Sequence, residues 1–135
     1  MVADEREFTL QIQDRRCDEF MVQQFWHQGR LANEWNVLFL KLANGPWLRF
    51  FFDAGVFFWR TEEPSLPENH EDNQYRLAKP DVAKAVEGRT IVDAVFSALK
   101  SGGRTLTLEL DDGMALHLHN DKDRSSVAFM RSHAT

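Results

Sequence analysis

The chain has 135 residues, of which 43% are hydrophobic, and its length fits one domain, residues 1–135, with a single core. Its formal net charge of -5 argues against a general nucleic-acid-binding protein, because phosphate contacts need clustered lysine and arginine. Cys17 is the only cysteine, which excludes an intramolecular disulfide and a cysteine-rich metal cluster and is typical of a reducing cytoplasm.

The first two elements are expected to be a strand and a helix. Phe8, Leu10 and Ile12 alternate with polar residues, which is the period of a half-buried strand. Beyond Asp14, apolar residues recur at helical spacing and predict a helix over 15–28, ended by Gly29. The residues at that spacing are Cys17, Phe20, Met21 and Phe25. A bent strand is the alternative, because further apolar residues widen the stripe.

A hairpin over 37–53 follows, within the segment 35–59, which holds nine of the sixteen aromatic residues. A three-residue connection at Asn44, Gly45 and Pro46 places six apolar residues on one face. The expected pairs are Leu42 with Leu48, Leu40 with Phe50, and Leu38 with Phe52. The opposite face carries Phe39, Phe51, Lys41 and Arg49, so we expect a helix or a partner to cover part of it. A kink at 54–55 then leads into a strand over 56–60.

An acidic surface loop is predicted at 61–74. It contains five acidic residues and neither lysine nor arginine, which leaves sixteen acidic and sixteen basic residues elsewhere. The acidic residues are Glu62, Glu63, Glu68, Glu71 and Asp72. The loop is either a solvated excursion or an electrostatic docking site for a basic protein, in which the carboxylates surround an apolar centre. Aromatic residues of the preceding strands, such as Phe39, Phe51, Phe57 and Trp59, are candidates for that centre.

The next two segments differ in how clearly they are encoded. Pro80 begins a short helix that carries Val82 and Val86 on one side and ends at Gly88. The segment 90–100 fits two structures. Val92, Val95, Phe96 and Leu99 have helical spacing, but Ile91, Val92, Val95 and Phe96 equally suit a buried strand.

A second hairpin, over 105–119, is predicted with a loop at 111–113 in which Gly113 supplies a positive φ. This register pairs Leu110 with Met114, Leu108 with Leu116, and Leu106 with Leu118. The other face then holds Thr105, Thr107, Glu109, His117 and His119. Two imidazoles at i and i+2 beside a carboxylate form a weak candidate metal site, and a solvated sheet face is the alternative. An edge strand is expected around 127–130.

Motifs of known enzyme classes do not occur in the sequence: GxSxG, a Walker sequence, GxGxxG and HExxH are all missing. Cys17 has no activating partner that can be read from the sequence, so we expect a small buried side chain rather than a nucleophile. The chain is therefore expected not to be an enzyme and to need no cofactor. The start MVADEREF lacks the features of a secretory signal, and the apolar runs are far shorter than the ~20 residues that span a bilayer, so no membrane partner is expected.

Over about residues 35–120, the order of segments resembles small bacterial immunity proteins of contact-dependent inhibition and related polymorphic toxin systems. The segments are EWNVLFLKL, WLRFFFDAGVFFWR, an acidic proline-containing loop, GRTIVDAV and LTLELDDGMALHLHN. The resemblance implies a cytoplasmic antidote without catalytic residues, which binds one toxin domain and blocks its active site or an essential surface. The acidic balance would suit a cationic nuclease toxin.

We therefore expect an α+β fold, built on a mainly antiparallel sheet with hairpins at 37–53 and 105–119 and one to three helices packed on it. The expected function is stoichiometric inhibition of a toxin, by a monomer or homodimer that contacts its partner through the acidic loop and Trp59. Two alternatives remain open. The first is a small-molecule or metal-binding module on the histidine-bearing face, and the second is a homo-oligomeric structural protein that associates through its aromatic strands.

Overall fold

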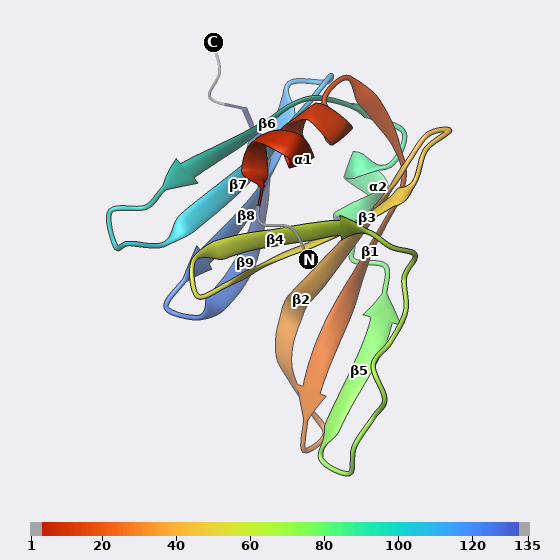
Figure 1. The fold of residues 1–135 in the computed structure, drawn as a ribbon, viewed down its shortest axis with the longest axis vertical. Helices are drawn as coiled ribbons and strands as arrows, with labels where there is room; N and C mark the ends of the chain where they lie inside the picture. The colour runs from red at the N-terminus through yellow and green to blue at the C-terminus, as the bar shows by residue number, and fades with distance from the viewer. Residues whose placement is uncertain (1–3, 133–135) are drawn as a thin grey trace.

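A computed structural model describes residues 4–132 of the chain, which form a mainly antiparallel sheet with two short helices (Figure 1). The helices are α1 (Glu5–Ile12) and α2 (Ala83–Val86). The first five strands are β1 (Arg15–His27), β2 (Arg30–Leu42), β3 (Trp47–Asp53), β4 (Val56–Thr61) and β5 (Asn73–Ala78). The remaining strands are β6 (Thr90–Ala98), β7 (Arg104–Leu110), β8 (Met114–Asp121) and β9 (Arg124–Arg131). The expected α+β class with a mainly antiparallel sheet is confirmed at this level.

Strand β1 joins the two halves of the sheet. The strand order is β4-β3-β2-β1-β6-β7-β8-β9. One edge of β1 pairs with two strands: Arg15 and Arg16, at its start, pair with β6, and its second half pairs with β5. The sheet curls around one core, to which residues of both halves contribute. Where the halves meet, the Gly55 amide in the β3–β4 turn donates to Asn120 Oδ1 of β8 at 3.0 Å.

The predicted strand at Phe8–Ile12 is wrong, because these residues lie in α1. Asp4 caps the helix, since its carboxylate accepts a hydrogen bond from the Glu7 amide at 3.1 Å. Phe8 and Ile12, one helical turn apart, are fully buried, whereas Leu10 between them is 61% exposed. The Phe8 ring contacts four aromatic rings of the sheet, and in this way α1 is fixed over the core. Those rings belong to Phe50, Phe57, Trp59 and Phe96.

The predicted helix over 15–28 is also wrong, and its alternative, a bent strand, is what the chain forms as β1. The register with β2 shifts between Cys17 and Glu19, so the buried residues change from Cys17 to Phe20 and Val22. A β-bulge adds one residue to a strand, and it therefore turns the strand period of two into a local spacing of three. That spacing imitates a helix.

Segment 90–100 contains β6, so the strand alternative is correct for 90–98. The strand carries an irregularity of the same kind, between Ile91 and Asp93, and the buried residues Ile91 and Ala94 are three apart. Val92 and Val95, which the helical reading placed on the apolar stripe, are 43% and 41% exposed.

The β2–β3 hairpin forms as predicted, with its register displaced by two residues. Leu40 pairs with Leu48 and Leu38 with Phe50, and the connection consists of Ala43, Asn44 and Gly45, closed between Leu42 and Pro46. A two-residue displacement keeps every side chain on its face, so the six expected apolar residues all lie in the core. Asn44 carries the positive φ of this turn, at 53°.

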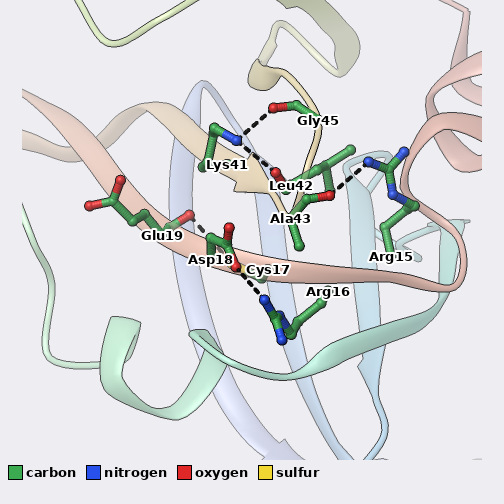
Figure 2. Close-up of polar contacts among 9 residues, drawn as sticks. All are labelled: Arg15, Arg16, Cys17, Asp18, Glu19, Lys41, Leu42, Ala43 and Gly45. Carbon is green, nitrogen blue, oxygen red and sulfur yellow. Dashed lines mark hydrogen bonds and ion pairs between the residues drawn. The ribbon is translucent and has the colours of Figure 1, made fainter.

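Two cations hold the tip of this hairpin (Figure 2). Lys41 Nζ donates to the carbonyl oxygens of Leu42 and Gly45, at 2.9 and 2.6 Å, and Arg15 donates to the Ala43 carbonyl at 3.1 Å. These contacts satisfy carbonyls that the tight turn leaves outside the strand ladder. The Arg15 contact also binds the hairpin to the start of β1.

The other predicted turns agree more closely with the structure. The expected kink at 54–55 is a two-residue hairpin turn, in which Ala54 and Gly55 both have positive φ, and β4 follows it. In the β7–β8 hairpin, Leu106 pairs with Leu118 and Leu108 with Leu116, which confirms the predicted register. Gly113 has a φ of 82°, and β9 forms the expected edge strand. The helix expected after Pro80 is α2, and Val86 is fully buried.

Candidate interaction surface

The acidic loop crosses the outer face of the sheet. It joins β4, on one side of the sheet, to β5, which lies beyond β3, β2 and β1. Pro67 in the loop lines the same groove as Gln23, Val37 and Phe51, which belong to β1, β2 and β3. The mixed outer face of the predicted hairpin is thus covered in part by the chain itself, and Phe39 on that face is fully buried.

Both ends of this loop are fixed by hydrogen bonds. At its start, Glu62 accepts from Arg60 at 2.8 Å and from Arg49 Nε at 3.2 Å. At its end, the Gln28 amide donates to the Asp72 carbonyl at 2.8 Å, and His70 and Asn73 exchange backbone hydrogen bonds. The loop is therefore an ordered part of the surface rather than a loose connection.

Glu62 compensates the charge of a largely buried arginine, Arg49. Desolvation lowers the pKa of the Arg49 guanidinium, the nearby charge of Arg60 lowers it further, and Glu62 opposes both effects. One carboxylate thus compensates two neighbouring cations, of which Arg49 is the more buried. Among the five predicted acidic contact residues, Glu62 has this structural role.

The other four acids, Glu63, Glu68, Glu71 and Asp72, are exposed. Within residues 4–132, none of these four carboxylates forms an ion pair, whereas acids elsewhere are paired, such as Glu5 with Arg104 at 2.8 Å and Glu87 with Lys79 at 2.7 Å. The outer part of the loop is consequently a fixed patch of uncompensated negative charge.

Trp59 does not contribute an exposed contact to this patch. Its side chain is 7% exposed, its ring packs against Phe8, and its Nε1 donates to the Asp4 carbonyl at 2.8 Å. Phe39 and Phe57, two further candidates for an apolar centre, are also buried in the structure. Phe51 is half-buried and stacks on Phe58.

Half-buried aromatic side chains lie instead where β1, β2 and β5 project together, at the bottom of Figure 1. The Phe25 and Tyr75 rings are 5.3 Å apart, and the Arg76 guanidinium lies 4.2 Å from the centre of the Trp26 ring. We call this three-stranded projection, residues 22–33 and 73–78, the finger. The sequence prediction missed it because β5 was read as the end of a loop and β1 as a helix. The run QYRLA, with its alternating polar and apolar residues, is the signal that could have identified β5.

The candidate metal ligands have another arrangement. His117 and His119 project from β8 with parallel rings 5.9 Å apart, and each ring is held by a threonine of β7. His117 Nδ1 lies 2.9 Å from Thr107 Oγ1, and His119 Nδ1 lies 2.8 Å from Thr105 Oγ1. Within the described part of the chain, no group of three or more His, Cys, Asp or Glu residues is placed to hold a metal ion, so Glu109 does not complete such a set.

Cys17 is fully buried in β1 rather than in the predicted helix. Its Sγ donates to the Glu19 carbonyl at 3.4 Å, and burial raises the pKa of the thiol to about 12, with the charge of Glu87 adding to the effect. A thiol with so high a pKa is a poor nucleophile at neutral pH. The predicted role as a small buried side chain agrees with this placement.

A polar groove of about 490 Å³ extends from the outer face to the seam between the sheet halves. Below, we call it the polar groove. Its polar lining consists of Gln23, Asn33, Asn36, Arg49, Asp53, Tyr75, Asn120, Asp123 and Ser125. Its apolar lining is Val37, Phe51, Phe52, Ala54 and Pro67. Gln23 and Asn120 are each 3% exposed, so two amide groups lie deep in the wall. No feature of the sequence had indicated this groove.

Comparison of the chain with protein-family models, with curated proteins and with solved structures found no match. Neither α1 nor α2, the helices within residues 4–132, is long and apolar enough to cross a membrane.

Proposed function

We propose that this chain is a stoichiometric protein-binding module of the immunity type, which binds one basic bacterial toxin domain and blocks its activity. One observation carries the proposal: the acidic loop is fixed at both ends, yet four of its five carboxylates have no ion-pair partner among residues 4–132. The resemblance of segments 35–120 to immunity proteins supports the same function.

An ordered loop with free carboxylates suits protein recognition for two physical reasons. Clustered charge of one sign steers a partner of the opposite sign and raises the association rate. In addition, a loop that is already ordered loses less conformational entropy on binding than a mobile one. Within residues 4–132, the four free carboxylates make no ion pair that would stabilise the fold.

The finger supplies apolar contacts beside the charge. The loop ends in the hydrogen-bonded pair His70 and Asn73, where β5 begins, so the acids and the finger are continuous. Tryptophan, tyrosine and arginine contribute most often to the energetic centre of protein interfaces, and Trp26, Tyr75 and Arg76 are of these types. The proposed interface therefore combines an acidic border with an aromatic centre.

The first test is a co-purification of the tagged chain with the product of the gene immediately upstream, expressed as its isolated C-terminal domain. We expect a one-to-one complex and restored growth of cells in which that domain is toxic. If the domain is toxic but neither binding nor rescue occurs, this pairing is refuted.

The second test asks whether the loop forms the contact. Replacing Glu68 and Glu71 by lysine should lower the association rate constant at low salt by about 10-fold or more, with a smaller effect on dissociation. The control replaces Glu7 and Asp81, exposed acids outside the loop, by lysine, and changes the net charge equally. If both pairs slow association equally, overall charge and not the loop determines the rate.

A further inference from the structure

The polar groove is lined by the side-chain amide of Gln23, which has no hydrogen-bond partner among residues 4–132. The Gln23 side chain lies on the outer face of β1, is 3% exposed, and makes no hydrogen bond within residues 4–132. The amide opens onto the groove, so its two N–H donors and its carbonyl oxygen are available to a ligand there.

Charge in the groove is unevenly distributed. Arg49 lines one end, where Glu62 compensates it at 3.2 Å. Asp53 lies four residues further along β3, about 13 Å away along an extended strand. Asp53 and Asp123 both line the groove, and neither forms an ion pair with another described residue. The uncompensated charge of the groove is therefore negative.

The groove walls are held in place by the fold. Asn120 accepts from the Gly55 amide at 3.0 Å and donates to Ser125 Oγ at 3.2 Å, which links the β3–β4 turn to the start of β9. Asn33 accepts from the Trp35 amide at 3.0 Å. The site thus has a preformed shape, which lowers the entropic cost of binding.

We infer that the polar groove binds a guanidinium group, as an arginine side chain of the partner protein. Guanidinium carries five donors and no acceptor, which matches two carboxylates and the oxygens of amide side chains. It is planar and weakly hydrated, so it also suits a wall with the aromatic rings of Phe51 and Tyr75. A phosphate or carboxylate ligand is disfavoured, because Asp53 and Asp123 would repel it.

This inference rests on the proposed function, in which the partner is a basic protein, but it can be tested without that partner. The isotope-labelled chain is titrated with Nα-acetyl-L-arginine methylamide and, separately, with the citrulline analogue, which has nearly the same shape and no charge. We expect saturable NMR shifts at the side-chain amides of Gln23 and Asn36, and at least about tenfold weaker binding of the citrulline compound. Absent shifts, or equal binding of the two compounds, would overturn the inference.

Variants locate the site. Asp53→Asn, an exposed change that keeps the shape, should weaken binding of the arginine compound about tenfold. Gln23→Leu should also weaken it, and Asp81→Asn, which changes an exposed carboxylate outside both the groove and the acidic loop, should leave it unchanged. If Asp81→Asn weakens binding as much as Asp53→Asn does, the compound responds to net charge alone and the groove is not its site.

The same variants separate this inference from the proposed function. If the toxin domain binds Asp53→Asn and Gln23→Leu as tightly as the unaltered chain, the partner does not use the groove, and the inference fails while the proposed function stands. If the arginine compound binds the groove but no toxin domain binds the chain, the proposed function fails and the guanidinium site remains.

Discussion

Replacing Phe8 by alanine tests the least expected feature of the fold, the docking of α1 into the core. Phe8 is fully buried and contacts four aromatic rings, with centroid distances from 4.9 to 6.2 Å. Truncation of a buried phenylalanine to alanine costs about 3–5 kcal/mol, from lost burial and from the cavity that remains. For 135 residues, typical stabilities per residue give a total of about 7–20 kcal/mol, so the loss is a large fraction.

The assay is equilibrium unfolding in urea, followed by tryptophan fluorescence. A loss of about 4 kcal/mol moves the midpoint down by about 2 M for a urea slope of about 2 kcal/mol/M. Leu10→Ala is the control on the same helix, because Leu10 is 61% exposed and its loss should change stability by less than about 0.5 kcal/mol. If the two variants unfold at similar urea concentrations, or Phe8→Ala costs less than about 1 kcal/mol, α1 does not pack as described.

Three further experiments test other contacts. Gly103→Ala should destabilise the chain by about 1–3 kcal/mol in the same assay, because its Cβ would collide with the backbone carbonyl of Asn120; an unchanged midpoint would contradict this close approach. A colorimetric thiol reagent at pH 8 should not modify Cys17 until the chain unfolds, because at a pKa of about 12 roughly one thiol in ten thousand is ionised; rapid modification of the folded chain would refute the described burial. Glu62→Gln should cost about 1 kcal/mol by urea unfolding and Glu63→Gln almost nothing, since only the former faces Arg49 and Arg60; equal costs would remove the anchoring role of Glu62.

The parts of the fold that the sequence predicted well are its hairpins. In the β7–β8 hairpin the period-2 pattern and Gly113 define one register, and the observed pairs agree with it. In the β2–β3 hairpin the pattern defines the buried face, but a displacement by two residues preserves that face. Pattern alone therefore cannot distinguish a loop at 43–45 from one at 44–46, and the choice depends on contacts such as Arg15 with the Ala43 carbonyl.

The errors in β1 and α1 have different physical causes. In β1 a bulge placed Cys17 and Phe20 three residues apart on the buried side, which a periodicity analysis reads as helix. In α1 the alternation of Phe8, Leu10 and Ile12 concealed a spacing of four between the two buried residues. Asp4 with Glu7 three residues later is the capping pattern that favours the helix, and it lies immediately before the apolar run.

The sequence predicted the negative charge of the candidate interaction surface but not the shape of that surface. Composition located the five acids of the loop, but their separation into one anchor and four free carboxylates depends on Arg49 and Arg60, which belong to β3 and β4. The half-buried aromatic residues of the finger could not be identified from the sequence, because their exposure depends on which strands project beyond the core. The polar groove joins residues from six strands and three connections, a combination that only the folded chain provides.

The distribution of charge within the loop separates a structural role from a binding role. A carboxylate that stabilises the fold should face a cation, as Glu62 does, and its neutralisation should reduce stability. Glu68 and Glu71 face no cation within residues 4–132, and together with Glu63 and Asp72 they add repulsion to a chain that already has a net charge of -5. Their neutralisation should leave stability unchanged or raise it slightly. In the proposed function, a basic partner would supply the positive charge that these carboxylates lack within residues 4–132.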